Sequence, residues 1–122
     1  MLRAFMRSKV HRATITDSNL NYVGSITMSP ELLAASDIGI GEVVQVLDID
    51  NGHRFETYTI LGAPGSNEIC VNGAAARLVQ QGDKVIILTY SYLADHEIRD
   101  HTMTVVHVDE DNNILEDAFA GL

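Results

Sequence analysis

The sequence predicts one small, mostly β domain with a few short helices. Its 122 residues, of which 46% are hydrophobic, suffice for a single core but not for two. Short segments rich in β-branched residues recur along the chain, and Gly, Pro, Asn or Asp residues punctuate them. Helix-favouring stretches are few and short. This pattern is typical of a compact β architecture, and residues 1–122 are expected to form a single domain.

The segments expected to be strands are rich in Val, Ile, Thr and Tyr and end at turn signals. Gly24 lies inside the second expected strand. A glycine inside a strand weakens the pairing, so its presence there needs a local structural explanation. Asn51-Gly52 is the signal of a tight hairpin. In chain order, the expected strands are residues 9–16, 20–28, 42–49, 54–60, 69–71, 84–93 and 103–108.

The expected helices are brief. Ser29 offers a capping hydroxyl and Pro30 suits the first helical position, so a helix is expected over residues 31–36. The alanine-rich residues 74–78 favour another, whose first amides lack intrahelical partners. Residues 95–100 are expected to form one helical turn.

Composition and charge limit the classes of function that this protein can have. The net charge of −9 argues against a nucleic-acid-binding protein, because phosphate binding needs a surplus of cations. No apolar run approaches the ~20 residues of a membrane helix, and the start of the chain does not resemble a secretory signal. The single cysteine, Cys70, excludes an internal disulfide and suits a reducing compartment, so a cytoplasmic location is expected. Flanked by Ile69 and Val71, Cys70 is expected to be a buried structural thiol.

Charge is unevenly distributed along the chain. Four of the eight basic residues are Arg3, Arg7, Lys9 and Arg12, whereas the tail over about residues 109–122 is acidic. The basic segment fits two interpretations equally well: a small anion site, or a solvated edge strand carrying protective charges.

The Gly24-Ser25 pair lies inside a run of strand-forming residues, 21–27. Such a pair usually marks a turn. Alternatively, the Ser25 hydroxyl attacks the neighbouring Gly24 carbonyl and converts the amide to an ester. Elimination then gives a dehydroalanine, and hydrolysis leaves a pyruvoyl group at a new amino terminus. The pair alone favours the turn.

Four local patterns stand in order along the chain: KVHR at 9–12, YVGS at 22–25, NGHRFETY at 51–58 and VNGAAA at 71–76. In combination and spacing they closely resemble the pyruvoyl-dependent aspartate 1-decarboxylases of bacterial pantothenate synthesis. The resemblance covers about residues 3–93. Residue 23 is valine where some relatives carry an acid, so this side chain is not expected to act directly in the chemistry.

The resemblance implies a small double-psi β-barrel that assembles as a homotetramer with active sites between subunits. It also implies self-cleavage into residues 1–24 and 25–122, with a pyruvoyl cofactor derived from Ser25. The pyruvoyl carbonyl forms a Schiff base with L-aspartate and withdraws the charge left when CO2 departs, giving β-alanine. No metal and no pyridoxal phosphate are expected.

The resemblance also implies residue roles. Lys9 and Arg54 hold the substrate carboxylates, and Tyr58 donates the proton to the substrate carbon. Thr57 assists self-cleavage and contacts substrate, while His11 and Tyr22 have supporting roles. The remaining substrate contacts are expected from Asn72, Gly73, Ala74 and Ala75.

Competing interpretations remain at this point. Arg54 and Tyr58 also suit ordinary strand residues of one face, because they are four positions apart. One alternative is a serine hydrolase that uses Ser25, but the sequence has no Gly-x-Ser-x-Gly elbow around this residue. The other alternative is a non-catalytic barrel that binds a partner. His96, His101 and His107 show no metal-ligand spacing and are expected at the surface.

Overall fold

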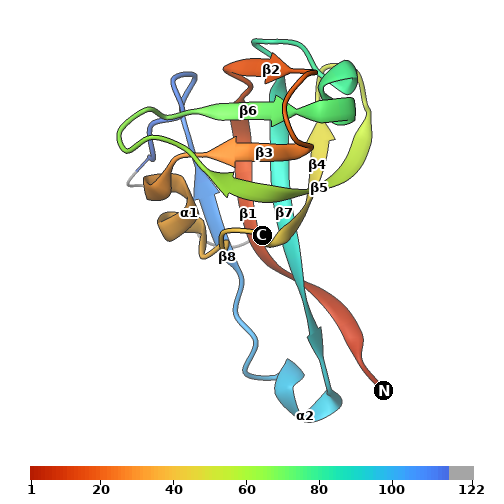
Figure 1. Ribbon diagram of the computed structural model, residues 1–122. Helices are drawn as coiled ribbons and strands as arrows, with labels where there is room; N and C mark the ends of the chain where they lie inside the picture. Colours follow the sequence, from red (N-terminus) through yellow and green to blue (C-terminus); the bar gives the residue numbers. More distant parts are fainter. Residues whose placement is uncertain (116–122) are drawn as a thin grey trace.

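A computed structural model describes residues 1–115 of the chain (Figure 1). Within these residues the strands form one eight-stranded sheet in the order β2-β6-β3-β5-β4-β7-β1-β8. The strands are β1 (Arg3–Thr14), β2 (Asp17–Asn19), β3 (Ser25–Met28), β4 (Val43–Asp48), β5 (Arg54–Leu61), β6 (Ile69–Asn72), β7 (Lys84–Leu93) and β8 (Thr104–His107). The predicted mostly β architecture is confirmed.

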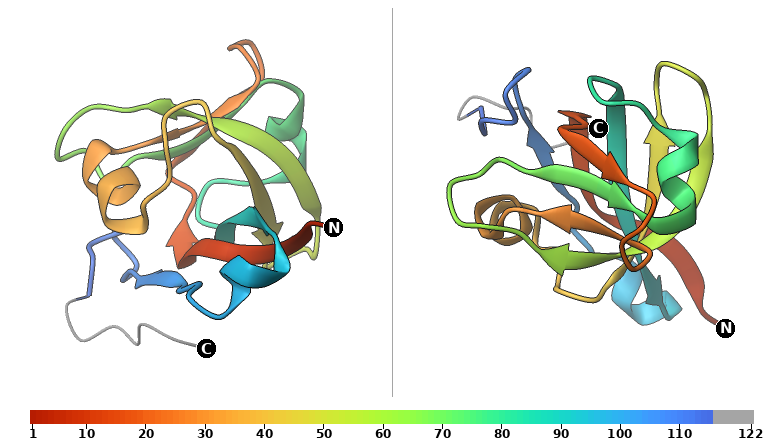
Figure 2. Two further views of the ribbon diagram at one scale, coloured as in Figure 1. Left: turned by 90° about the horizontal axis from the view of Figure 1, so that it is seen from below. Right: turned by 45° about the horizontal axis from the view of Figure 1, so that its top comes forward.

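The sheet folds over on itself into a barrel-like shape. In Figure 1, β6, β3 and β5 cross in front of β1, β7 and β4, which run nearly at right angles to them. Parallel pairs join β3 to β5, β2 to β6 and β1 to β8, whereas the other pairs are antiparallel. β1 and β7 extend beyond the barrel as a two-stranded arm, seen in Figure 1 and in the right view of Figure 2.

The core lies between the crossed strands and follows strand alternation. On β3, Ile26 and Met28 are fully buried and face the core, and on β6 Ile69 and Val71 do the same. Side chains two residues apart share a face, so Ser25 and Thr27 must lie on the opposite face of β3. Burying residues of this size contributes about 1.5–3 kcal/mol each. The core therefore fixes which face of β3 carries the candidate chemistry.

The helices agree with the sequence, with small shifts at their ends. α1 (Pro30–Ser36) is capped by the Ser29 side chain, which accepts a hydrogen bond from the Leu32 amide, and it ends at Asp37 in a left-handed conformation. The predicted alanine-rich helix is a 3-10 helix, η1 (Gly73–Leu78), and α2 (Asp95–Ile98) is a single turn. None of the described helices is long and apolar enough to cross a membrane.

Two strand predictions need correction. β1 begins at Arg3 rather than at residue 9, because its first residues pair with the end of β7, where Arg3 faces Leu93. Residues 20–24 are not part of a strand: the chain turns there between β2 and β3. Gly24 therefore lies in a loop that leads into β3, not in the interior of a strand.

Candidate active site

The Gly24-Ser25 peptide lies where the loop over residues 20–24 enters β3. Ser25 is fully buried, whereas Gly24 is exposed. The Ser25 hydroxyl donates a hydrogen bond of 2.8 Å to the Val23 carbonyl, and it accepts one of 3.0 Å from Asn72 Nδ2. These bonds hold the hydroxyl alongside the Gly24 peptide unit. No histidine contacts Ser25 in the described part of the chain, so the serine hydrolase alternative lacks its general base.

Gly73 brings a second backbone segment against this peptide. It has a φ of +75°, and a Cβ at this position would lie 2.6 Å from Gly24 Cα and 2.9 Å from Gly24 N. Such distances leave no room for a side chain, and the positive φ also favours glycine. Gly24 itself has open space at its Cβ position and no positive φ. The steric requirement for glycine therefore lies at residue 73.

Asn72 connects Ser25 to the strand beside it. Its side chain is 3% exposed, and Ser25 and Asn72 are cross-strand partners on β3 and β6. Asn72 Nδ2 also donates to Thr27 Oγ1 at 3.0 Å, and Asn72 Oδ1 accepts from Cys70 Sγ at 3.3 Å. Thr27 and Cys70 thus belong to the site although the sequence analysis gave neither a role there. The two-residue spacing along each strand was the signal that could have revealed them.

Cys70 is inert in this setting. Burial raises the pKa of its thiol, and the carboxylates of Asp17 and Glu68 raise it further. The thiol therefore stays protonated and serves as a small buried side chain, as the sequence predicts.

On the other side of β3, the parallel strand β5 carries Tyr58. Ile26 pairs with Thr59, so one step back along both strands Tyr58 stands level with Ser25. Tyr58 is 37% exposed and lies on the outward face of β5 with Arg54, as their spacing predicted. The half-buried Thr57 lies on the alternate face, and no hydrogen bond joins Thr57 to Gly24 among residues 1–115.

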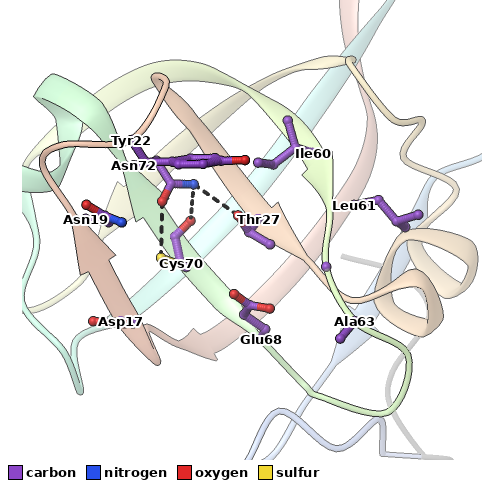
Figure 3. Close-up of a pocket in the computed structure, with 11 residues that line it drawn as sticks. Asp17, Asn19, Tyr22, Thr27, Ile60, Leu61, Ala63, Glu68, Cys70 and Asn72 are labelled. Carbon is purple, nitrogen blue, oxygen red and sulfur yellow. Dashed lines mark hydrogen bonds between the residues drawn. The ribbon is translucent and has the colours of Figure 1, made fainter.

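A hollow of about 380 Å³ opens beside Asn72 on this face. In Figure 3 the Tyr22 ring lies over Asn72, while Thr27, Cys70 and Glu68 line the floor. The lining residues are Asp17, Asn19, Tyr22, Thr27, Ile60, Leu61, Gly62, Ala63, Glu68, Cys70 and Asn72. Tyr22 therefore lines the hollow next to Asn72.

The charges of this hollow do not suit an anion. Its lining carries the two carboxylates Asp17 and Glu68 and no cationic side chain. A dianionic ligand would be repelled by these charges unless cations approach from elsewhere. The hollow of one chain is therefore electrostatically incomplete for such a ligand.

The two predicted cations lie elsewhere in the chain. Lys9 is on β1, where it pairs with Leu88 of β7, and three strands separate β1 from β3 in the sheet. Arg54 is at the start of β5, four residues before Tyr58, and its guanidinium donates to Gln45 at 3.4 Å. At ~3.3 Å per residue, Arg54 begins about 13 Å along the strand from Tyr58. Lys9 and Ser25 thus lie on strands that are not neighbours in the sheet.

His11 contacts another histidine instead of the hollow. It lies at a bulge of β1, and its ring packs edge-on against His107 of β8 with the centroids 5.1 Å apart. Burial lowers the pKa of His11, and Lys9, His107 and Arg12 lower it further through their charges. His107 is therefore half-buried rather than a surface residue. His101 is half-buried as well, with Nε2 2.8 Å from the Met6 carbonyl, and only His96 is exposed as expected.

The two alanines expected at the site lie on η1, directly after Gly73. Ala74 is exposed, and Ala75 is half-buried against the core. The site residues brought together within one chain are therefore Tyr22, Gly24, Ser25, Tyr58, Asn72 and Gly73.

Comparison with known proteins decides the family. The family described as aspartate decarboxylase matches residues 1–115. This chain belongs to the aspartate decarboxylase family. The match extends beyond the 3–93 resemblance seen in the sequence and includes the first part of the acidic tail.

Members of the aspartate decarboxylase family from several bacteria are similar over nearly the whole chain. An aspartate 1-decarboxylase of Heliobacterium modesticaldum is 54% identical, over 97% of this chain and 89% of the relative. Those of Caldicellulosiruptor saccharolyticus and Staphylococcus aureus are 55% and 53% identical, each over 95% of this chain and 91% of the relative. Family membership supports the predicted activity, a carbon–carbon lyase reaction on aspartate, and does not favour a non-catalytic module.

Proposed function

We propose that this chain cleaves itself between Gly24 and Ser25 and then decarboxylates L-aspartate to β-alanine, the reaction that supplies pantothenate synthesis. The observation that carries the proposal is the buried Ser25 hydroxyl, held along the Gly24 peptide by the Val23 carbonyl and Asn72. Membership of the aspartate decarboxylase family links this geometry to the decarboxylation of aspartate.

Self-cleavage uses groups of the chain itself. Ser25 Oγ attacks the Gly24 carbonyl carbon, the C–N bond breaks, and an ester joins Gly24 to Ser25. Loss of the Ser25 α-proton expels the Gly24 carboxylate and leaves dehydroalanine, which water converts to the pyruvoyl group with release of ammonia. Asn72 orients the hydroxyl through its Nδ2 donor. Thr57 is proposed to assist the tetrahedral step.

The surroundings of Ser25 fit a pyruvoyl group. The position is buried, Asn72 offers it a donor, and the small Gly73 lets the backbone approach closely. When present, the group supplies an electron sink for the charge that decarboxylation leaves on the substrate carbon. Tyr58, level with Ser25 on the next strand, is proposed to deliver the proton to that carbon.

Substrate binding is proposed to involve more than one subunit. L-Aspartate is a dianion, and the hollow beside Ser25 supplies only carboxylates. Lys9 and Arg54 are the proposed clamp for its two carboxylates, with His11 in support. Because one chain keeps Lys9 three strands away from Ser25, we propose a homotetramer whose sites lie between subunits. Asn72, Gly73, Ala74 and Ala75 are the proposed backbone and amide contacts.

Intact mass of the purified protein tests the cleavage. We expect two fragments, residues 1–24 and 25–122, and the larger should resist amino-terminal sequencing because a keto group replaces its amine. Ser25→Ala is the matched control, which should remain one folded chain of 13.3 kDa without decarboxylase activity. Fully active protein made only of uncleaved chain would contradict the proposal.

A further inference from the structure

Three carboxylates converge away from the candidate active site, at the turn of the β4–β5 hairpin. They belong to Asp48 at the end of β4, Asp50 in the hairpin turn and Asp83 just before β7. One oxygen of each lies within 4.8 Å of one oxygen of each of the others. An acidic cluster on a protein surface is common, so its burial and partners decide whether it has a use.

Asp48 distinguishes this cluster from solvated surface acids. Its side chain is 2% exposed, and its Oδ2 is buried with no hydrogen-bond partner in the described part of the chain. The neighbour of this carboxyl is Asp83, which is also an acceptor when ionised. Burial, together with Asp83, raises the pKa of Asp48 to about 6. A buried acceptor of this kind is costly unless something positive meets it.

The backbone holds all three carboxylates in place. Asp48 Oδ1 accepts from the Asp50 amide at 2.8 Å, and Asp50 Oδ2 accepts from the Lys84 amide at 2.7 Å. Asp83 Oδ2 accepts from the Gln80 amide at 3.0 Å. Each carboxylate therefore keeps its second oxygen free of protein donors among residues 1–115. The cluster is preorganised rather than incidental.

No ion pair within residues 1–115 neutralises the cluster, although Arg77 and His53 line the hollow beside Asp50 and Asp83. None of the ion pairs in this part of the chain includes Asp48, Asp50 or Asp83. The nearest lysine in sequence, Lys84, directs its ammonium to Thr14 Oγ1 at 2.6 Å instead. The three carboxylates therefore lack a direct cationic partner among the described residues, which leaves room for an ion from solution.

We propose that Asp48, Asp50 and Asp83 form a binding site for a hard divalent cation of the calcium type. Carboxylate oxygens are the ligands that such ions prefer. Two oxygens that share one Ca²⁺ at ~2.4 Å can be at most ~4.8 Å apart, which is the limit that this cluster meets. Water completes the coordination on the exposed side of Asp50.

A proton shared between two of the carboxylates is a simpler way to relieve their repulsion, but the geometry favours the cation. A proton between Asp48 and Asp83 would relieve that pair alone and leave the Asp50 charge beside it. A divalent ion touches all three oxygens at once and neutralises two of the three charges. The site would also fasten the Asp50 turn to the start of β7, where the Lys84 amide already binds Asp50.

Calcium-dependent thermal stability of the full mature protein tests this site. After chelator treatment and desalting, the protein is melted at pH 7.5 with CaCl2 or with NaCl of equal ionic strength. For a dissociation constant of about 1 mM, 10 mM CaCl2 should raise Tm by about 5–6 °C. Calorimetric titration should give one Ca²⁺ per chain.

Variants identify the ligands. Asp50→Asn and Asp48→Asn should each abolish the calcium-dependent shift, and Asp48→Asn should raise the calcium-free Tm because its amide can donate to Asp83. Glu110→Gln is the matched control, since it removes the same charge from an exposed acid and should keep the full shift. If calcium does not shift the Tm of the unmodified protein, the proposal is overturned, and a proton shared between Asp48 and Asp83 becomes the explanation. A shift that persists in Asp50→Asn and Asp48→Asn overturns it too.

Discussion

The candidate chemistry depends on a few buried contacts around one peptide bond. Ser25, Asn72 and Gly73 form a continuous arrangement in which a side-chain amide orients a hydroxyl and a glycine lets two backbones touch. Each contact involves residues about 50 positions apart in sequence, yet each belongs to a short recognisable motif. Single substitutions in this group should therefore separate folding from self-cleavage.

Gly73→Ala should impair both stability and self-cleavage. The new Cβ would lie 2.6 Å from Gly24 Cα, at a residue whose φ is +75°. The positive φ alone costs about 1–2 kcal/mol, and displacement of the Gly24 backbone adds to that. Gly65→Ala is the matched control, because Gly65 has a φ of +72° with nothing within 4 Å of its Cβ position. Denaturant unfolding and the cleaved fraction are measured; equal effects of the two variants would refute the contact argument.

Tyr58→Phe should leave self-cleavage intact and slow turnover. The phenol is level with Ser25 and is 37% exposed, so its loss removes a proton donor without opening the core. General acid catalysis typically contributes about 10²–10⁴-fold, and kcat should fall by that order while the fragments form normally. Steady-state kinetics on cleaved protein provide the measurement. An unchanged kcat would assign the proton to another group.

At the scale of elements, the parallel contact between β1 and β8 contains a pair of histidines, His11 and His107. His11 and His107 are register partners, and His11 Nδ1 and His107 Nε2 are buried without partners in the described chain. Burial, followed by the charges of Lys9, His107 and Arg12, lowers the pKa of His11 below its usual 6.5. The folded chain therefore takes up this proton at lower pH than the unfolded chain does.

This difference predicts that acid weakens the attachment of β8. Because the folded pKa of His11 is the lower one, its contribution to stability is complete above pH 6.5 and is lost as the pH falls below that value. Thermal melts of the parent chain and of His11→Gln across pH 5–8 provide the measurement. The two Tm curves should converge toward low pH relative to their separation at pH 8; a constant separation would show that His11 does not titrate differently on folding.

At the scale of the whole molecule, the charge distribution supports the proposed assembly of several chains. In the sheet order, three strands lie between β3, which carries Ser25, and β1, which carries Lys9, so the proposed clamp takes Lys9 from another copy. Mixed assemblies of two inactive variants test this directly. Ser25→Ala lacks the cleavage nucleophile, and Lys9→Ala lacks the proposed clamp.

Co-expressed Ser25→Ala and Lys9→Ala chains should regain activity, whereas each alone should be inactive or nearly so. In a mixed tetramer, a Lys9→Ala chain provides the cleaved Ser25 position and a Ser25→Ala neighbour provides Lys9. Light scattering establishes the oligomeric state, and the specific activity of mixed particles is compared with each parent variant. Absence of recovery in demonstrably mixed tetramers would place Lys9 outside the neighbouring site.

Much of the fold could be predicted from the sequence, because the signals for helix starts, turns and strands are local. The Ser29-Pro30 start of α1, the hairpin turn at Asn51-Gly52 and the β character of residues 84–93 all match the structure. The early start of β1 and the turn over residues 20–24 were missed, since each depends on a partner: β7 extends β1, and β2 pairs with β6 before the chain turns.

The candidate site divides in the same way. The four motifs predict Ser25, Asn72, Gly73 and Tyr58 as site residues, and each of these predictions depends on short local patterns. Thr27 and Cys70 were missed as site residues because only the pairing of β3 with β6 places them against Asn72. His11 was expected to support the site, whereas its contact within one chain is His107.

By itself, the sequence determined which reactive side chains the protein has, which family it resembles and roughly where its strands lie. Motifs and periodicity are properties of neighbouring residues, so they can be read without the fold. Only the tertiary structure decided which groups meet. It set Gly73 against Gly24, buried the Ser25 hydroxyl beside Asn72, placed Lys9 and Ser25 on strands that are not neighbours and gathered three carboxylates at one hairpin. Strand register and crossing bring distant residues into contact, and these depend on how the whole core packs.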